Sequence, residues 1–326
     1  MGGVPTKVIA VGIDGTGSSG WRRNDGANSH VFRFITDING GPAGGNIEAG
    51  VRSSDGAKRY WHGPGDLGSE MGDISQAVFR FVLDEMLRLT RDTGCAQTDF
   101  KICLVGHSRG AVAAIKVANF LNGDEYQNMT IEYGGVLSSP VQVGFIGLYD
   151  TVDRSTISIN VAMPNVTHGS HARRQNRGSF LLFGGSRSTF GTVDIPARFP
   201  TFDVDTAHGG VGGDPGYFTR LGQMSADYYC NALQLIMTQE QLNREYGVHG
   251  SRMGVEPNYR PLTGSDATEI RARLARSVRD VARADDVIRA KAVLAGFSFV
   301  SPVSTLQQCG VRDQGLWPLM MSAIRS

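Results

Sequence analysis

The residues with the clearest potential for chemistry are those at 106–110, GHSRG, which fit the pattern G-x-S-x-G. An apolar run typical of a buried strand, 101–105, comes directly before them. A run rich in alanine and branched apolar residues follows, without proline and without further glycine until Gly123. Strand, tight turn and helix in this order form the context of a nucleophile elbow. The pattern therefore predicts that Ser108 is a nucleophile that attacks an acyl group.

The two glycines of this motif have a steric explanation. A serine on a sharp strand-to-helix turn has strained backbone angles, so the residues two positions away must lack a side chain to avoid collision. The helix that follows directs the positive end of its dipole at the place where an oxyanion would form. The alternative is an ordinary glycine-bounded turn with a solvated serine, because glycine accounts for 43 of the 326 residues.

A nucleophilic serine needs a base, and the chain has seven histidines, at positions 30, 62, 107, 168, 171, 208 and 249. In hydrolases with a nucleophile elbow the serine comes first, the acid second and the histidine last, which disfavours the two histidines that precede the motif. His107 adjoins the serine on a tight turn, where neighbouring side chains diverge. His208 follows a short strand and lies in a glycine-rich loop, so it is the preferred base. The alternative for His208 is a solvated loop histidine.

The acid that orients the base is expected at the end of a strand between the serine and the histidine. Asp150 closes the apolar run VQVGFIGLYD and is the best-placed candidate, and Asp153 lies three residues further on. Asp203 and Asp205 lie on the strand of the histidine itself, which suits packing or a substrate contact better. An aspartate at a strand end can also simply cap the next turn.

An oxyanion hole needs backbone N–H donors. One is expected from Arg109, the residue after the nucleophile. The other is expected from the glycine-rich loop DGTG after the first strand, where Gly15 and Thr16 are the candidates. Such a loop can alternatively cradle a phosphate, but this one lacks the G-x-G-x-x-G pattern and the lysine of a P-loop.

Strands and helices alternate along the chain. Strand-like runs occur at 7–13, 57–63, 101–105 and 141–150, and the segment 199–210 carries a shorter one. Helical patterns occur at 74–89, 225–246 and 266–295. This alternation predicts an α/β fold of the α/β-hydrolase type, with a mostly parallel sheet flanked by helices. The whole chain, 1–326, is predicted to be a single domain. Within it, 154–198 is predicted to be an insertion or lid, because it lacks clear periodicity and is rich in Ser, Asn, Arg and Gly.

Composition excludes several classes of function. The net charge is +1, which does not favour a nucleic-acid partner. The four cysteines are scattered and form no C-x-x-C pair, so neither a metal site nor a dense disulfide framework is indicated, and no cofactor is predicted. The chain begins without a basic region followed by a long apolar stretch, and no apolar run is long enough for a membrane span. We therefore expect neither a classical secretory signal nor a transmembrane helix.

Four motifs together resemble a known family. They are IDGTG near the start, GHSRGA at 106–111, FIGLYDTV at 145–152 and AHGGVGG at 207–213, and RYWHGPG at 59–65 adds to them. The motifs span the first two thirds of the chain and are similar to those in the α/β-hydrolase domain of type VI secretion lipase effectors, a phospholipase family. The resemblance implies Ser108, Asp150 and His208 as a catalytic triad, the same three residues that position selects. It also implies hydrolysis of lipid esters, above all of glycerophospholipids.

The same resemblance implies partners and a location. The partners would be a lipid or phospholipid substrate, a membrane surface contacted transiently, a secretion machinery and a cognate immunity protein. The protein would be cytoplasmic in the producing cell and exported without a signal peptide into the periplasm of a target cell as an antibacterial toxin. Tyr149 replaces the more usual tryptophan before the acid, and His107 replaces an aromatic residue. Larger relatives add a module for membrane attachment, for which this chain has little room.

One apolar run inside the predicted insertion is a candidate for contact with lipid. It consists of Phe180, Leu181, Leu182 and Phe183, and arginines at positions 173, 174, 177 and 187 bracket it. The apolar side chains are predicted to cover an acyl-binding groove or to touch a bilayer, while the arginines meet phosphate groups. The alternative is a buried strand or hairpin in a larger loop.

Three functions are compatible with these features. The first is a lipase or phospholipase effector. The second is an esterase or thioesterase that uses the same triad on soluble substrates and has no toxic role. The third is a catalytically silent binding module that retains the fold, which an intact set of serine, aspartate and histidine disfavours.

Overall fold

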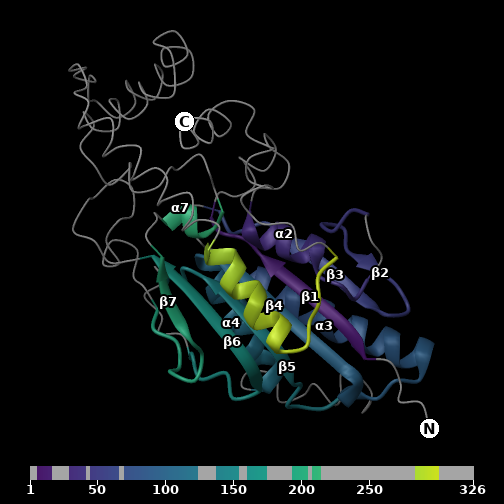
Figure 1. The fold of residues 1–326 in the computed structure, drawn as a ribbon. Helices are drawn as coiled ribbons and strands as arrows, with labels where there is room; N and C mark the ends of the chain where they lie inside the picture. Colours follow the sequence, from purple (N-terminus) through teal and green to yellow (C-terminus); the bar gives the residue numbers. More distant parts are fainter. Residues whose placement is uncertain are drawn as a thin grey trace, which may run out of the picture.

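The computed structural model describes residues 6–16, 29–41, 45–65, 70–123, 137–153, 160–174, 193–204, 208–213 and 283–300. Within these ranges seven strands form one sheet (Figure 1). The strands are β1 (Lys7–Ile13), β2 (Val51–Arg52), β3 (Gly56–Trp61), β4 (Phe100–His107), β5 (Val143–Tyr149), β6 (Val166–Arg174) and β7 (Thr201–Val204).

The sheet has the strand order β2-β3-β1-β4-β5-β6-β7. All its pairs are parallel except that of β2 with β3, which is antiparallel. The carboxyl ends of the central parallel strands meet at one edge, which is where such sheets build their sites. β4 and β5 are neighbours in register, with His107 beside Tyr149, so the residues that follow these two strands are brought together.

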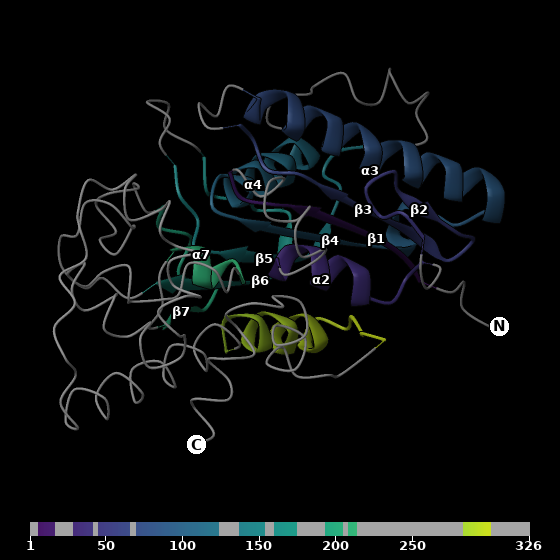
Figure 2. The same ribbon diagram turned by 90° about the horizontal axis from the view of Figure 1, so that it is seen from above.

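Helices cover both faces of the sheet. The helices are α2 (His30–Asp37), α3 (Met71–Thr93), the short 3₁₀ helix η1 (Gln97–Asp99), α4 (Arg109–Asn122), α7 (His208–Val211) and a helical segment at 283–294. Figure 2 shows α3 and α4 above the sheet, and α2 together with the segment at 283–294 below it. The predicted α/β class, a mostly parallel sheet flanked by helices, is confirmed.

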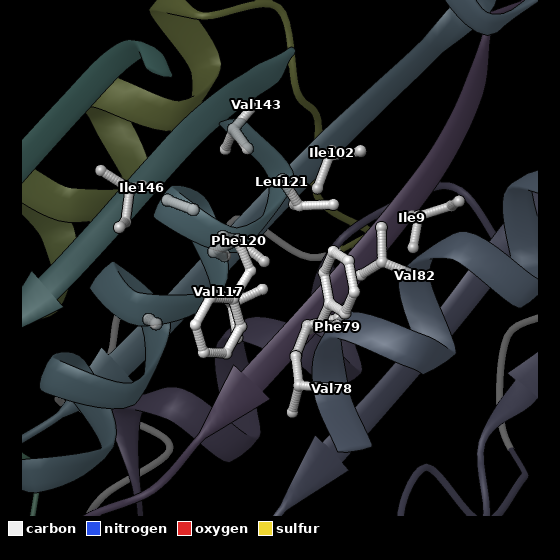
Figure 3. Close-up of a cluster of buried hydrophobic side chains, with 14 of the residues drawn as sticks. Ile9, Val78, Phe79, Val82, Ile102, Val117, Phe120, Leu121, Val143 and Ile146 are labelled. Atoms are coloured by element: carbon white, nitrogen blue, oxygen red, sulfur yellow. The ribbon is translucent and has the colours of Figure 1, made fainter. Parts of the chain in front are cut away.

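Two hydrophobic clusters fill the space between these layers, because neighbouring residues of a buried strand point to opposite faces. Ile9 and Ile102 point toward α3 and α4, where they join Val78, Val82 and other apolar side chains in the cluster drawn in Figure 3. On the opposite face the neighbouring positions, Ala10 and Cys103, pack with apolar residues of α2 and of the segment at 283–294. A segment far along the chain is thus part of the same core as the first strand.

Most of the predicted elements agree with the structure. The strand at 7–13 is β1, the strand at 57–63 is β3, and the helix at 74–89 is the longer α3. Sequence reasoning did not predict α2 and β2. The helix at 225–246 lies outside the described residues, and the described part of the predicted helix at 266–295 begins at residue 283.

The insertion predicted at 154–198 needs a correction. Residues 166–174 form β6, which pairs with β5 on one side and β7 on the other, so this part of the segment belongs to the central sheet. The prediction failed because buried polar side chains, including Ser170 and His171, hide the apolar alternation that usually marks a strand. Phe180, Leu181, Leu182 and Phe183 lie outside the described residues, and their predicted contact with lipid stays a prediction.

Candidate active site

Ser108 occupies a strained turn between β4 and α4. Its backbone angles are φ 56° and ψ −126°, a conformation that side-chain-bearing residues rarely adopt. It is the N-cap residue of α4, yet its hydroxyl makes no capping hydrogen bond. The strained turn therefore leaves the Oγ atom available for another partner, as in a nucleophile elbow.

The two glycines of the motif are required by close backbone contacts. A Cβ atom on Gly106 would lie 2.5 Å from the carbonyl oxygen of Gly110. A Cβ atom on Gly110 would lie 2.2 Å from the carbonyl oxygen of Asp14. Both obstacles are backbone atoms that cannot rotate away, so the steric explanation of G-x-S-x-G applies here and also ties α4 to the loop after β1.

The structure brings together the three residues that the sequence selected. The Oγ atom of Ser108 lies 2.8 Å from Nε2 of His208, and Nδ1 of His208 lies 2.7 Å from Oδ2 of Asp150. Asp150 directly follows β5 and is held in place by its backbone N–H, which donates to the carbonyl of Ala172 on β6 at 2.7 Å. With Nδ1 donating to the carboxylate, Nε2 is the nitrogen free to accept a proton from the serine.

The other acids considered from the sequence do not take the place of Asp150. The carboxylate of Asp203 accepts a hydrogen bond from the side chain of Arg173 at 2.9 Å. The carboxylate at Nδ1 of His208 is that of Asp150, so Asp153 does not fill this position, and Asp205 lies outside the described residues. The expectation that the Asp150 carboxylate approaches the ring of His208 is therefore confirmed as geometry.

Hydrogen bonds from His30, the first residue of α2, hold the loop that carries His208. The side chain of His30 donates from Nδ1 to the carbonyl of Val211 at 2.9 Å, and its backbone N–H donates to the carbonyl of Gly212 at 2.9 Å. Burial lowers the pKa of His30 to about 3, so its ring is neutral and carries one N–H. His30 precedes the nucleophile in the chain, and its position next to this loop gives it a structural task instead of a catalytic one.

His107 supports the loop from its other end. Its Nε2 donates to the backbone carbonyl of His208 at 3.2 Å. The two imidazole rings are tilted by 32° relative to each other, and their centroids lie 4.9 Å apart. Glycine at positions 15 and 212 leaves room for this ring, because a Cβ atom at either position would lie within 2.5 Å of it. Nε2 of His107 thus binds the backbone of His208, whereas Nε2 of His208 is the ring nitrogen that contacts Ser108.

The loop after β1 is braced by a buried carboxylate. Asp14 accepts hydrogen bonds from the hydroxyl of Tyr60 at 2.6 Å and from the backbone N–H of Gly15 at 2.7 Å. Burial acts to raise the pKa of Asp14, but the neighbouring His107 and the Tyr60 hydrogen bond outweigh it and hold this pKa below its usual value. The carboxylate thus keeps its charge and organises the loop.

The hydrogen bond from the Gly15 N–H to Asp14 corrects one of the oxyanion-hole donors predicted from the sequence. The N–H of Gly15 is used by Asp14, so it does not serve the oxyanion hole for which the sequence proposed it. Thr16 and Arg109 remain as candidates. The Nε atom of Arg109 donates to Oγ1 of Thr16 at 2.7 Å, which holds the two candidate donors next to each other. The backbone N–H of Arg109 belongs to the first turn of α4.

A buried arginine contacts the acid. The Nη1 atom of Arg174, the last residue of β6, pairs with Oδ2 of Asp150 and lies 3.0 Å from Nδ1 of His208. Its backbone N–H donates to Oδ1 of Asp150 at 3.3 Å. The side chain is 0% exposed, so the predicted contact of this arginine with a lipid phosphate is wrong. Its neighbour Arg173 instead forms ion pairs with Asp203 and Asp194.

The electrostatics of the site favour a neutral base and an ionised acid. Burial lowers the pKa of His208 to about 4, and the charges of His107 and Arg174 add to this effect against the raising influence of Asp150. Burial acts to raise the pKa of Asp150, but the His208 hydrogen bond and the charges of His208, Arg174 and His171 hold it well below its usual range. At neutral pH the pair is therefore ready to accept a proton from Ser108.

These pKa directions predict how activity depends on pH. Because a general base must be unprotonated, we expect kcat/KM for a short soluble ester to be constant from neutral pH down to about pH 5. It should then fall as the pH drops through the pKa of His208, about 4. Near-ultraviolet circular dichroism at each pH controls for unfolding. An acid limb at 6.5, the ordinary value for histidine, would contradict this environment for His208.

Nothing in the described part of the chain forms a metal centre. Among those residues no group of three or more His, Cys, Asp and Glu side chains is arranged to hold a metal ion. No helix among them is both long enough and apolar enough to cross a membrane. The groups that meet at the site are a hydroxyl, an imidazole and a carboxylate, together with backbone N–H groups, and this set is suited to acyl transfer.

The mostly parallel sheet, the strained turn at Ser108 after β4 and the position of Asp150 after β5 agree with the expected α/β-hydrolase-like fold. Comparison with known proteins adds only a distant likeness. No family model matches the chain, and no curated protein matches it significantly.

Two solved structures align with most of this chain. The crystal structure of an uncharacterized protein from Pseudomonas aeruginosa aligns with 96% of this chain at 15% identity and a TM-score of 0.37, and the chain spans 56% of that protein's length. The structure of the Tle1 effector bound to the VgrG spike from the Type 6 secretion system aligns with 99% of this chain and 79% of that one, at 15% identity and a TM-score of 0.43. Likeness at this level supports no conclusion about this chain's fold or activity.

Proposed function

We propose that this protein is a serine ester hydrolase in which Ser108 is the nucleophile, His208 the general base and Asp150 the acid that orients the base. The observation that carries the proposal is the continuous chain of short contacts from the Ser108 hydroxyl through the His208 ring to the Asp150 carboxylate. The strained backbone of Ser108 adds support, because strain of this kind is retained at functional sites.

The reaction proposed for this site has two halves. In the first, Oγ of Ser108 attacks the carbonyl carbon of the ester while Nε2 of His208 accepts the hydroxyl proton. The tetrahedral intermediate then collapses, the alcohol leaves with the proton from His208, and an acyl-enzyme remains. In the second half, water loses a proton to His208 and attacks the acyl group, and the carboxylic acid is released as Ser108 recovers its proton.

The negative charge on the intermediate needs donors that are already in place. The N–H of Arg109 at the start of α4 and the N–H of Thr16 in the loop after β1 are the proposed pair. The bond from the Arg109 side chain to the Thr16 hydroxyl, at 2.7 Å, supports their placement side by side. The positive end of the α4 dipole favours the same charge.

The proposed substrates are lipid esters, in particular glycerophospholipids. This part of the proposal is supported by the resemblance of the motifs at 13–213 to those of type VI secretion lipase effectors. It extends to an antibacterial effector that is exported by a secretion machinery, contacts the target membrane transiently and is neutralised in the producer by an immunity protein. The apolar run at 180–185 is the proposed contact with the acyl chains.

A lipid panel tests the substrate class. Vesicles of phosphatidylethanolamine and phosphatidylglycerol, a short soluble ester and an acyl thioester are offered to the protein, and the products are identified by mass spectrometry. We expect fatty acid and lysophospholipid from the vesicles. Turnover of only the short ester or the thioester would assign a soluble-substrate esterase or thioesterase. A folded protein that turns over none of them would be a binding module.

A further inference from the structure

The carboxylate of Asp150 contacts an arginine in addition to the imidazole that such an acid orients. Arg174 is 0% exposed and shares the Oδ2 atom of Asp150 with the ring nitrogen of His208. Its own backbone N–H holds the second carboxylate oxygen. The guanidinium and the imidazole thus approach one carboxylate oxygen from two sides.

The charged and titratable groups around His208 come from several elements. They are Asp150 after β5, Arg174 and His171 on β6, His107 on β4, Asp14 after β1 behind His107, and His30 on α2 at the far end of α7. Nε2 of His171 accepts a hydrogen bond from the backbone N–H of Thr151 at 3.2 Å, so this nitrogen carries no proton in that contact. Within this set, Arg174 carries a permanent positive charge and contacts both the Asp150 carboxylate and the His208 ring.

We propose that Arg174 is a positioning residue that fixes the Asp150 carboxylate and keeps the His208 ring uncharged in acidic solution. Its importance for catalysis rests on the proposed function, but its effect on the ring does not. An arginine guanidinium keeps its charge at every pH at which a protein is folded.

The physical reason is competition for one negative charge. An isolated buried Asp-His pair favours the imidazolium, because the carboxylate is its only counter-charge. Here the guanidinium already neutralises Asp150, and a proton on His208 would place a second positive charge 3.0 Å from Nη1 of Arg174. The lowered pKa of His208, about 4, agrees with this arrangement. The expected consequence is a base that stays available at acidic pH.

A matched comparison is present on the same strand. Arg173 precedes Arg174, and its guanidinium forms ion pairs with Asp203 at 2.9 Å and with Asp194 at 3.5 Å, both of them partly or largely exposed carboxylates. The two arginines are neighbours in the sequence and carry the same charge, but the side chain of Arg174 is fully buried against Asp150. Substitution of Arg173 controls for the loss of one positive charge from β6.

The test follows the ring of His208 directly, so it does not require turnover. Protein labelled with ¹³C at the histidine Cε1 positions is titrated by NMR, and the His208 signal is assigned by its loss in His208→Gln. Arg174→Gln retains an N–H donor for Asp150 and removes the charge, so the pKa of His208 should rise by about one unit. Arg174→Lys, which keeps a charge, and Arg173→Gln should leave it within about half a unit of the parent value.

Each outcome decides for or against the proposal. An unchanged His208 titration in folded Arg174→Gln would overturn it and reduce Arg174 to a packing role, in which case activity would fall equally at all pH values. If Arg174→Gln does not fold, Arg174→Lys decides, because titration of His208 at its ordinary value in that variant would equally overturn the proposal. Labelling by an organophosphonate is measured in parallel. Its absence in the parent protein would refute the proposed function and leave the role of Arg174 to be judged by the titration alone.

Discussion

Replacing Ser108 with alanine is expected to lower the rate of ester hydrolysis by about 10⁴ or more, since the loss of a triad nucleophile typically has an effect of this size. The hydroxyl at 2.8 Å from His208 is the atom that would form the acyl-enzyme. The substitution removes one oxygen and leaves the backbone turn as it is, so the variant should unfold at a temperature close to that of the parent. Initial rates on a soluble ester and on phospholipid vesicles measure the effect.

A second serine provides the matched control for this variant. Ser75 is also buried, but its hydroxyl donates to the carbonyl of Met71 within α3 and not to His208. Ser75→Ala should retain the parent rate. Hydrolysis by Ser108→Ala at the rate of Ser75→Ala would show that the elbow serine is not the nucleophile.

Replacing Asp150 with asparagine is expected to have two separate effects. Turnover should fall by about 10⁴, because in Ser-His-Asp enzymes an asparagine at this place holds the imidazole in the wrong tautomer. The free energy of unfolding should also decrease by about 3–5 kcal/mol, because the buried guanidinium of Arg174 loses its counter-charge. Rates on a soluble ester and unfolding in denaturant measure the two effects independently.

A double variant separates catalysis from stability. In Asp150→Asn/Arg174→Met no buried charge lacks a partner at this position, so much of the lost stability should return. The turnover should remain low, because the acid is still missing. Asp153→Asn and Asp203→Asn serve as controls, and a loss of turnover in one of them together with normal turnover in Asp150→Asn would move the role of the acid to that residue.

The part of this site that could be predicted from sequence consists of residues with local constraints. Ser108 is marked by its two glycines, whose Cβ atoms would collide with the backbone. Asp150 is marked by the end of an apolar strand, and His208 by the order in which the three groups occur. These constraints involve either a few neighbouring residues or the order of the elements along the chain. Each kind of constraint can be recognised in the sequence before the fold is known.

The remaining features depend on contacts between distant segments. Arg174 belongs to a strand whose residues are largely polar, and such an arginine is normally exposed. Its burial becomes evident only when β6 is placed beside β5 and its end meets Asp150. The carboxylate of Asp14, which accepts from the Gly15 N–H, likewise has a partner on a different strand, because Tyr60 on β3 donates to it. Sequence patterns alone do not show which polar groups will be enclosed together.

The central claim is that Ser108 is a nucleophile activated by His208, and reaction with a fluorophosphonate tests it most directly. The reagent forms a covalent adduct only with an activated hydroxyl, so the test does not depend on knowing the substrate. Peptide mapping by mass spectrometry is predicted to place one adduct on Ser108, to find none in Ser108→Ala, and to find the reaction greatly slowed in His208→Gln. A folded parent protein that forms no adduct, or that carries it on a different residue, would contradict the account.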